Sequence, residues 1–233
     1  MGAIEADPIP VRLGGGERPL SPAQERMWLL DRLEADAGAY NVFLAHRLRG
    51  DLDADRLAAA VGAIAARHEI LRTTYASRDG EPVQIVREPG DGVPLERLDL
   101  SGLPAGSREA RARELAAERI RRPFDLAAGP PWRASLLRLD EREHVLCVVF
   151  HHIAVDGWST ELFSAELAAL YPDPYGQAPA PPALQYGDYA AWQRERLAEE
   201  AAGQLAYWRD RLADPPVLDL PLDRPRPATR GAA

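Results

Sequence analysis

The chain has 233 residues, which is enough for one sizeable hydrophobic core or two small ones. It carries 36 acidic and 28 basic residues, so its net charge is −8. That charge argues against a nucleic-acid-binding protein, which needs a basic surface to neutralise phosphates. No apolar run approaches the length of a membrane span, and the first residues lack the pattern of a signal peptide. We therefore expect a soluble, cytoplasmic protein that binds neither nucleic acid nor membrane.

The sequence contains one cysteine, Cys147, within the apolar stretch HVLCVVF. No disulfide can form within the chain, which fits a reducing compartment. An apolar strand raises the pKa of a thiol, so we expect Cys147 to be a small buried hydrophobic residue rather than a nucleophile.

Residues 1–19 are rich in proline and glycine and lack periodicity, which is typical of a linker. The first predicted helix begins in the stretch LSPAQERMWLLDRL. Ser21 is a favourable N-cap, Pro22 suits the first helical position, and Gln24 completes a capping box.

The next two elements are a strand and a second helix. Alternation in NVFLAHRLRG predicts a strand with one shared face formed by Val42, Leu44, His46 and Leu48. Asp53 can cap the helix that follows, whose apolar stripe comprises Leu57, Val61, Ile64 and Ala65.

Two hairpins flank a third helix. Residues 71–76 and 82–88 surround the turn signal SRDGE, and residues 132–140 and 144–150 surround a second turn. Between the hairpins, residues 107–122 have a serine cap and helix-forming composition until Pro123 ends the pattern.

The C-terminal part alternates helical and proline-rich stretches. A helix is expected to begin near Trp158 to Thr160, and a long one to cover residues 186–212 after a proline-rich connector. Hairpins mixed with helices predict an α+β domain, with helices packed on a largely antiparallel or mixed sheet.

Two adjacent histidines, His151 and His152, end an apolar run in the stretch FHHIAVDGWS. The run VLCVVF is typical of a buried strand. Successive strand residues point to opposite faces, so both imidazoles cannot enter one site while the strand geometry lasts. We expect one structural histidine and one that faces a cleft, with Gly157 letting the chain turn towards the next helix.

Three interpretations fit the histidine pair. The plainest is two hydrogen-bonded histidines at a strand end. A metal site that includes Asp156 is the second, but zinc needs three or four ligands and no further His or Cys spacing supplies them. The third is acid–base chemistry by a neutral imidazole near a helix N-terminus. The spacing H-H-x-x-x-D-G favours the third without deciding it.

Asp156 has three possible roles of its own. It can orient an imidazole, cap the following helix or pair with an arginine. We favour the arginine pair, because an aspartate beside a buried strand end needs a partner and the chain is rich in arginine. Ser159 lacks the G-x-S-x-G setting of a nucleophile, so we expect its hydroxyl to cap the helix.

Four stretches of the sequence form a recognisable set. FHHIAVDGWS contains the pattern HHxxxDG, and the other three are LSPAQERMWLL (20–30), RHEILRTTY (67–75) and YGDYAAWQ (186–193). Taken in chain order, they resemble the four N-terminal motifs of the condensation domains of nonribosomal peptide synthetases, with Tyr75 where phenylalanine is usual. The set covers residues 20–193, and four motifs in order make the resemblance specific.

Related domains differ at these positions. Heterocyclisation domains replace the two histidines with aspartate, and epimerisation domains usually read DGVSW where this chain reads DGWST. Inactive recruiting domains lose the second histidine, whereas His152 is present here. A condensation domain is therefore the best match.

The resemblance implies a chloramphenicol-acetyltransferase-like lobe. In the family, two such lobes form a V with a tunnel between them. The motifs of the C-terminal lobe have no counterpart after residue 193, so the implied organisation is an interdomain linker at 1–19, an N-terminal lobe at 20–213 and an extended tail or inter-lobe linker at 214–233. An excised piece and a free-standing half both fit this pattern.

The resemblance also implies roles for the histidine loop. His152 would be the catalytic group, which orients or deprotonates the amine of an acceptor aminoacyl thioester as it attacks a donor thioester. His151 would be structural. Asp156 would be structural too, in an ion pair with Arg72 rather than Arg67.

Two residues after Asp156 complete the implied site. Gly157 would leave room there, with its backbone N–H near the reacting thioester, and Trp158 would pack the loop. No metal and no directly bound cofactor are implied, because phosphopantetheine arrives on the carrier proteins.

The implied function is that of a peptide-bond-forming acyltransferase in the biosynthesis of antibiotics and other secondary metabolites. Its partners would be an upstream donor carrier protein, a downstream acceptor carrier protein and the missing C-terminal lobe. We expect the single lobe to be inactive without that second half. The alternative is a non-catalytic lobe that binds a carrier protein or another domain.

Overall fold

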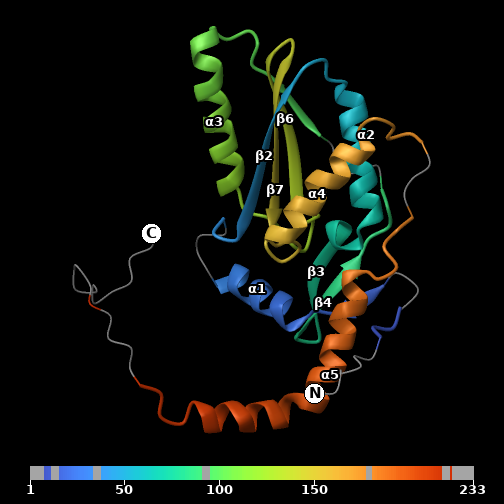
Figure 1. The fold of residues 1–233 in the computed structure, drawn as a ribbon, viewed down its shortest axis with the longest axis vertical. Helices are drawn as coiled ribbons and strands as arrows, with labels where there is room; N and C mark the ends of the chain where they lie inside the picture. The colour runs from blue at the N-terminus through green and yellow to red at the C-terminus, as the bar shows by residue number, and fades with distance from the viewer. Residues whose placement is uncertain are drawn as a thin grey trace. The chain divides into compact units, whose positions relative to one another are not determined.

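The computed structural model describes residues 8–11, 16–33, 38–90, 95–176, 180–216 and 221. The chain divides into two compact units, Met1–Glu195 and Arg196–Ala233. The first unit contains every strand of the described residues and carries the histidine pair. It confirms the predicted α+β class, with helices packed on two sheets (Figure 1).

The larger sheet has four strands in the order β2-β7-β6-β5. They are β2 (Asn41–Arg49), β7 (Glu143–His151), β6 (Trp132–Asp140) and β5 (Glu96–Asp99). β2 and β6 both pair antiparallel with β7, as the predicted hairpin requires, and β5 pairs parallel with β6. β7 is therefore hydrogen-bonded on both edges.

Helices cover both faces of this sheet (Figure 1). Leu146, Val148 and Phe150 of β7 pack in one cluster with α2 (Ala54–Arg67) and α4 (Gly157–Leu170). On the other face, Cys147 packs with α3 (Ala105–Arg121), where burial raises the pKa of its thiol as expected. β7 is thus buried on both faces, which explains its unbroken apolar sequence.

The predicted faces of β2 and α2 are confirmed. The stripe of α2 is buried, and three of the four β2 residues pack against the same cluster. The fourth, His46, has its Nε2 atom 2.9 Å from the hydroxyl of Ser164 on α4. Asp53 caps α2 by accepting hydrogen bonds from two backbone N–H groups of the first turn.

The smaller sheet has the order β1-β4-β3. β3 (Thr73–Arg78) and β4 (Glu81–Val86) form the predicted hairpin, and the turn contains Asp79 and Gly80 at positive φ. β1 (Glu17–Pro19) pairs with β4. The expected linker at 1–19 is therefore wrong for residues 17–19, which belong to the folded unit; residues 1–7 and 12–15 of that linker lie outside the described residues.

The helix α1 (Pro22–Leu33) begins with the predicted capping box. The backbone N–H of Gln24 donates to the hydroxyl of Ser21, and the backbone N–H of Ser21 donates to the side-chain oxygen of Gln24. The same Gln24 side chain donates to the hydroxyl of buried Tyr75 on β3 at 3.3 Å. This cap therefore also joins α1 to the smaller sheet.

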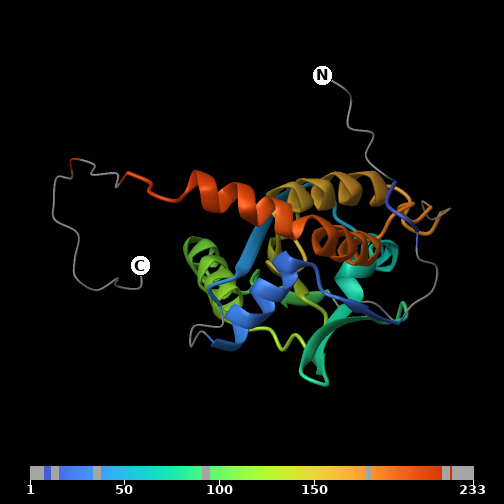
Figure 2. The ribbon, with the colours of Figure 1, turned by 90° about the horizontal axis from the view of Figure 1, so that it is seen from below.

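The first turns of α5 (Tyr186–Arg211) lie beside the start of α1 (Figure 2). The hydroxyls of Tyr186 and Ser21 are 3.0 Å apart, and Asp188 forms a buried ion pair with Arg18 at 2.9 Å. An added Cβ on Gly187 would come within 2.7 Å of the Arg18 side chain, so glycine permits this close approach.

The unit Arg196–Ala233 contains the remainder of α5. Arg196 pairs with Glu200 at 2.7 Å, and the rings of Tyr207 and Trp208 meet edge to face. The predicted tail at 214–233 falls mostly outside the described residues, which include only 214–216 and 221 of it. The boundary between the two units falls within α5, after Glu195, and the expected lobe end at 213 stays a prediction.

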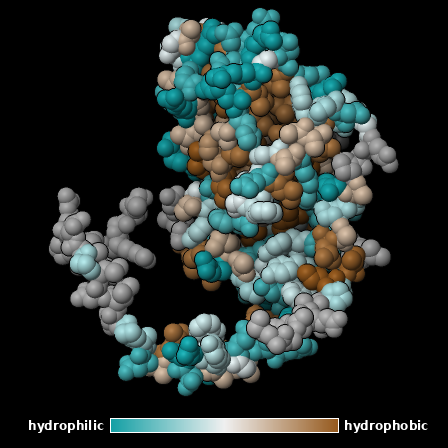
Figure 3. Space-filling view, in the orientation of Figure 1, coloured by the Kyte–Doolittle hydropathy of each residue, from teal (hydrophilic) through white to brown (hydrophobic). Residues whose placement is uncertain are grey.

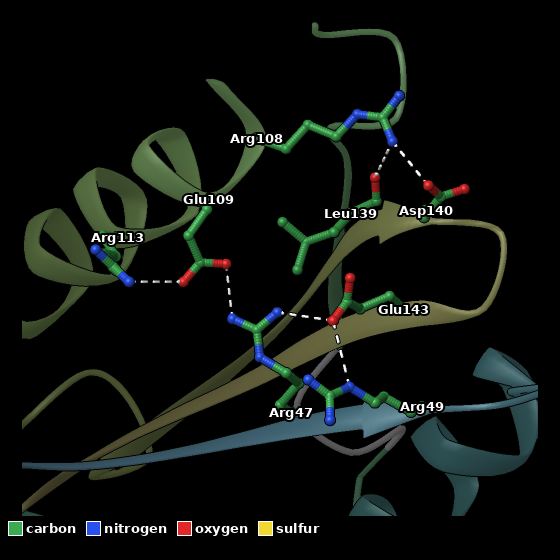
Figure 4. A network of polar contacts seen from close by, with 8 residues as sticks. All are labelled: Arg47, Arg49, Arg108, Glu109, Arg113, Leu139, Asp140 and Glu143. Atoms are coloured by element: carbon green, nitrogen blue, oxygen red, sulfur yellow. Dashed lines mark hydrogen bonds and ion pairs between the residues drawn. The ribbon is translucent and has the colours of Figure 1, made fainter. Parts of the chain in front are cut away.

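Arginine side chains tie α3 to the sheet at the end of β7 that lies away from the histidine pair (Figure 4). Arg47 of β2 pairs with Glu109 of α3 at 2.6 Å and with Glu143 of β7 at 2.9 Å. Arg108 of α3 donates to the carboxylate of Asp140 at 2.9 Å. Each pair is partly exposed and contributes little to stability alone, so any stabilisation comes from the pairs acting together as a network.

Several element boundaries differ from those predicted. α3 begins at Ala105 with Pro104 at its N-cap, so Ser107 is not the cap. The short strand β5 was not predicted, and it lacks alternating apolar residues. None of the described helices combines the length and apolar character needed to cross a bilayer.

A core substitution tests the placement of β7. Leu146→Ala should lower the free energy of unfolding by about 2–5 kcal/mol, because the fully buried side chain leaves a cavity between the sheet and its helices. Arg138→Ala, which removes an exposed side chain from β6, should change it by less than about 0.5 kcal/mol. Urea denaturation followed by circular dichroism measures both, and equal effects would contradict this placement.

Candidate active site

The two histidines occupy different environments at the end of β7. His151 is the last residue of the strand and is 0% exposed, whereas His152 is exposed. The strand-parity prediction of one buried histidine and one facing outwards is therefore confirmed.

His151 lies in a closed pocket of side chains. The backbone N–H of Ile153 donates to its Nδ1 atom at 3.1 Å, and its Nε2 atom is 3.3 Å from Oδ1 of Asp31 on α1. The rings of Tyr40 and Phe124 pack against the imidazole. Burial lowers the pKa of His151, although the carboxylate of Asp31 acts in the opposite direction.

His152 faces a cavity of about 880 Å³. Its backbone is held at the rim because its N–H donates to the carbonyl oxygen of Tyr40 at 2.8 Å. The cavity is lined by residues from α1, from the segment after α2, from the loop after β7 and from the start of α5; examples are Gln24, Met27, His68, Ile70, Asp156, Leu184 and Tyr189. The other three sequence motifs each contribute side chains to the walls of the cavity through these elements.

Asp156 is the N-cap of α4. Its Oδ1 atom accepts hydrogen bonds from the backbone N–H of Ser159 at 2.9 Å and from the Ser159 hydroxyl at 2.6 Å. The Asp156 N–H donates back to the Ser159 hydroxyl, which completes a capping box. The pKa of Asp156 is lowered, first by the hydroxyl of Ser159 and then by its backbone N–H.

The predicted ion pair between Asp156 and an arginine is wrong. Within the described part of the chain, no arginine pairs with Asp156, because its carboxylate turns to the free N–H groups of α4. Ser159 is the third residue of α4 and the second member of the capping box, not the N-cap itself. Of the three roles considered for Asp156, the helix cap is the one observed.

The two candidate arginines have other partners. Arg72 ends the short 3₁₀ helix η1 (Glu69–Arg72), not a strand as predicted, and its guanidinium lies 3.6 Å from Glu69 on the same turn. It also donates to the carbonyl oxygen of Arg87. Arg67 ends α2 and pairs with Glu166 of α4 at 3.3 Å. The described contacts of both arginines thus join segments other than the Asp156 loop.

Sequence reasoning missed His68, which lines the same cavity as His152. Its Nε2 atom is 2.8 Å from a carboxylate oxygen of Glu166, so it joins the end of α2 to α4. The signal was available, because His68 belongs to the stretch RHEILRTTY.

Within the part of the chain that the structure describes, no three His, Cys, Asp or Glu side chains gather in a way that could hold a metal ion.

Comparison with known families agrees with this geometry. The family model of the condensation domain matches residues 15–233. The chain belongs to the condensation domain family.

Relatives of this condensation domain chain include peptide synthetases. It is 45% identical to a linear gramicidin synthase protein of Brevibacillus parabrevis, over 99% of this chain and 5% of that protein. It is 44% identical to the phosphinothricin tripeptide synthetase PhsC of Streptomyces viridochromogenes, over 93% of this chain and 21% of that protein. The condensation domain sequence therefore spans only a small part of these relatives.

Solved condensation-type structures share the fold. The X-domain from teicoplanin biosynthesis, solved in complex with OxyB, superposes with a TM-score of 0.77 at 37% identity, over 97% of this chain and 50% of that one. A structure that describes condensation domain-mediated chain release from the enacyloxin polyketide synthase gives a TM-score of 0.73 at 32% identity, over 91% and 41%. The chain thus spans about half the length of these solved relatives.

Two further residues, which follow Asp156, can be placed in the structure. An added Cβ on Gly157 would meet no atom within 4 Å, so none of the described residues requires glycine there. Trp158 is 77% exposed, which contradicts the prediction that it packs the loop. Trp158 is the second residue of α4, and its ring lies on the exposed surface of the helix.

The cap of α4 generates a stability prediction. Asp156→Ala should lower the free energy of unfolding by about 1 kcal/mol, because α4 loses its capping box. The pKa of Asp156 is lowered in the folded protein, so the charged cap stabilises above the unfolded carboxyl pKa and its contribution is lost as pH falls through the folded pKa. The difference between variant and parent should therefore shrink in acid.

Urea denaturation at several pH values measures this effect. Asp156→Asn is the matched control, since asparagine is a comparable N-cap and should retain most of the stability. An Asp156→Ala variant that unfolds at the same urea concentration as the parent would show that the cap contributes nothing.

Proposed function

We propose that this chain is the N-terminal half of a domain that forms a peptide bond between two carrier-bound thioesters, with His152 as its catalytic residue. One observation carries the proposal: His152 is exposed in a cavity of about 880 Å³, while its neighbour His151 is completely buried. A single reactive imidazole of the pair is thereby presented to a space large enough for a substrate.

The reaction requires the protein mainly to orient the two substrates and to assist the transfer of one proton. The acceptor amine attacks the donor carbonyl, a C–N bond forms and the donor C–S bond breaks. The amine gives up a proton, and the departing carrier thiolate takes one. An imidazole at the rim of the cavity can orient the amine or move that proton, so His152 suits either task.

The N-terminus of α4 supports the same placement. Gly157 is the first residue of α4, and its backbone N–H is one of the four that a helix leaves without an internal partner. Positive partial charge gathers at such an end, where it stabilises negative charge that develops on a nearby thioester oxygen. Asp156 has the structural task of starting this helix in the correct place.

A second lobe and carrier proteins complete the proposed enzyme. Solved relatives are about twice as long as this chain. Apolar side chains are exposed beside the cavity, including Leu162 at 45% and Leu184 at 40%, and both line it. Hydrophobic residues also gather on the surface over β2 and α4 (Figure 3). We expect phosphopantetheine-bearing carriers to deliver both substrates, and the lobe alone to be inactive because water enters the open cavity.

A non-catalytic interaction module is the second candidate. It is favoured by the likeness to the X-domain, a relative that was solved in complex with a partner, OxyB. Under this alternative, the exposed surface around the cavity would bind a protein and His152 would not contribute to turnover. The retained His152 argues for the enzyme, because a binding surface does not require an imidazole at the cavity rim.

A condensation assay separates the two candidates. Donor- and acceptor-loaded carrier proteins are mixed with this chain alone, or with this chain joined to the C-terminal half of a condensation domain, and the dipeptidyl carrier is detected by intact mass. We expect product only from the joined protein. His152→Ala in the joined protein should reduce the rate by roughly 100-fold or more, because the positioned acid–base group is lost.

Arg142→Ala is the matched control, since Arg142 lies in the exposed β6–β7 turn at the far end of the sheet. It should leave the rate unchanged. If His152→Ala retained the parental rate, His152 would not be the catalytic residue. Product from the single lobe would show that the second half is not needed.

A further inference from the structure

We propose that Asp31 is a positioning residue for His152, and that it acts by holding the buried imidazole of His151 in one tautomer. This inference rests on the proposed function for its catalytic consequence. Its structural part concerns only the described contacts around His151.

The first observation is a pair of complementary buried atoms. His151 Nε2 and Asp31 Oδ1 are 3.3 Å apart, and the Asp31 side chain is only 15% exposed. The approach is an ion-pair contact, and neither atom has a hydrogen-bond partner among the described residues. Leaving a buried carboxylate oxygen or ring nitrogen without a partner is costly, so each atom needs the other.

The second observation determines where the imidazole proton lies. The backbone N–H of Ile153 donates to Nδ1 of His151, so Nδ1 carries a lone pair. In a neutral imidazole the proton is then on Nε2, which is the atom that faces the Asp31 carboxylate. The loop and the aspartate therefore select the same tautomer from opposite sides of the ring.

This tautomer holds the turn that carries His152. The imidazole of His151 binds the N–H of Ile153, and the backbone N–H of Ala154 donates to the carbonyl oxygen of His151 at 3.0 Å. Both bonds span His152. With the proton on Nδ1 instead, two N–H groups would face each other at Ile153, and the turn would have to open.

The position of Asp31 in its helix gives an independent reason to expect such a role. Asp31 lies in the last turn of α1, where a negative charge is unfavourable to the helix dipole. The chain contains 28 basic residues, all of them arginine, yet no described arginine pairs with Asp31. The carboxylate is instead turned inwards, towards the residue that precedes His152.

The structural part is tested by NMR on the chain as it exists. Long-range ¹H–¹⁵N spectra should show His151 with a protonated Nε2 and an unprotonated Nδ1. Asp31→Ala should produce a mixture of tautomers, while Asp31→Asn, whose side-chain oxygen can still accept from Nε2–H, should remain closer to the parent. An unchanged tautomer in Asp31→Ala would overturn the proposal.

The catalytic part is tested in the protein joined to its second lobe. Asp31→Ala should lower kcat by roughly 10- to 100-fold with little change in KM, because a displaced imidazole fails in the reaction and not in binding. Asp31→Asn should recover much of that loss. Circular dichroism and thermal unfolding establish whether each variant is folded. If Asp31→Ala does not fold, Asp31→Asn still tests the proposal.

Glu161→Gln is the matched control for removal of one negative charge. Glu161 is an exposed residue of α4, and the substitution should leave both the tautomer and kcat at the parental values. If His152→Ala abolishes activity while Asp31→Ala keeps the parental kcat, the proposed function stands and this inference fails. If His152→Ala is fully active, the proposed function fails, and the tautomer result still decides the contact between Asp31 and His151.

Discussion

The site depends on β7, a strand that is hydrogen-bonded on both edges and covered on both faces. With two neighbouring strands and helices on each side, β7 has no freedom to shift its register without moving apolar residues out of two clusters. The residue at which β7 ends is therefore determined by this packing. That end separates His151, which belongs to the core, from His152, which belongs to the cavity.

The surroundings of the cavity come from segments that are distant in the sequence but joined by buried polar contacts. Gln24 caps α1 and also reaches Tyr75 on β3, while Ser21 contacts Tyr186 on α5. Such contacts specify geometry because each member has few alternative partners in the interior. Residues of the sequence motifs thus line the cavity around His152 and join the segments that form its walls.

Much of the fold could be predicted because it follows from short-range patterns. The capping box at Ser21, the alternation in β2 and the turn at Asp79 and Gly80 all contain their own signals, and so does the parity of His151 and His152. What could not be predicted depends on choices between partners. The Asp156 carboxylate could in principle pair with an arginine or cap the following helix. It caps the helix, because Ser159 is three residues away and supplies two donors, its backbone N–H and its hydroxyl.

Other features that the sequence did not predict have the same origin. β5 is a strand only because β6 offers it a parallel edge, and β1 is a strand only because β4 does; neither has enough residues to show a pattern alone. The contact between Asp31 and His151 joins residues that are far apart in the chain, and nothing in the neighbourhood of either residue indicates it. Long-range pairing is decided by tertiary geometry, which a local pattern does not contain.

The ion pair between Arg18 and Asp188 has a consequence for how the lobe is made. Its two members are 170 residues apart, and the hydroxyl contact of Ser21 with Tyr186 spans 165. On a ribosome that adds about 5–20 residues per second, β1 and α1 emerge roughly 10 to 30 seconds before their partners on α5 exist. These two contacts therefore cannot form until α5 has been synthesised, which places them among the last of the described long-range contacts to become available.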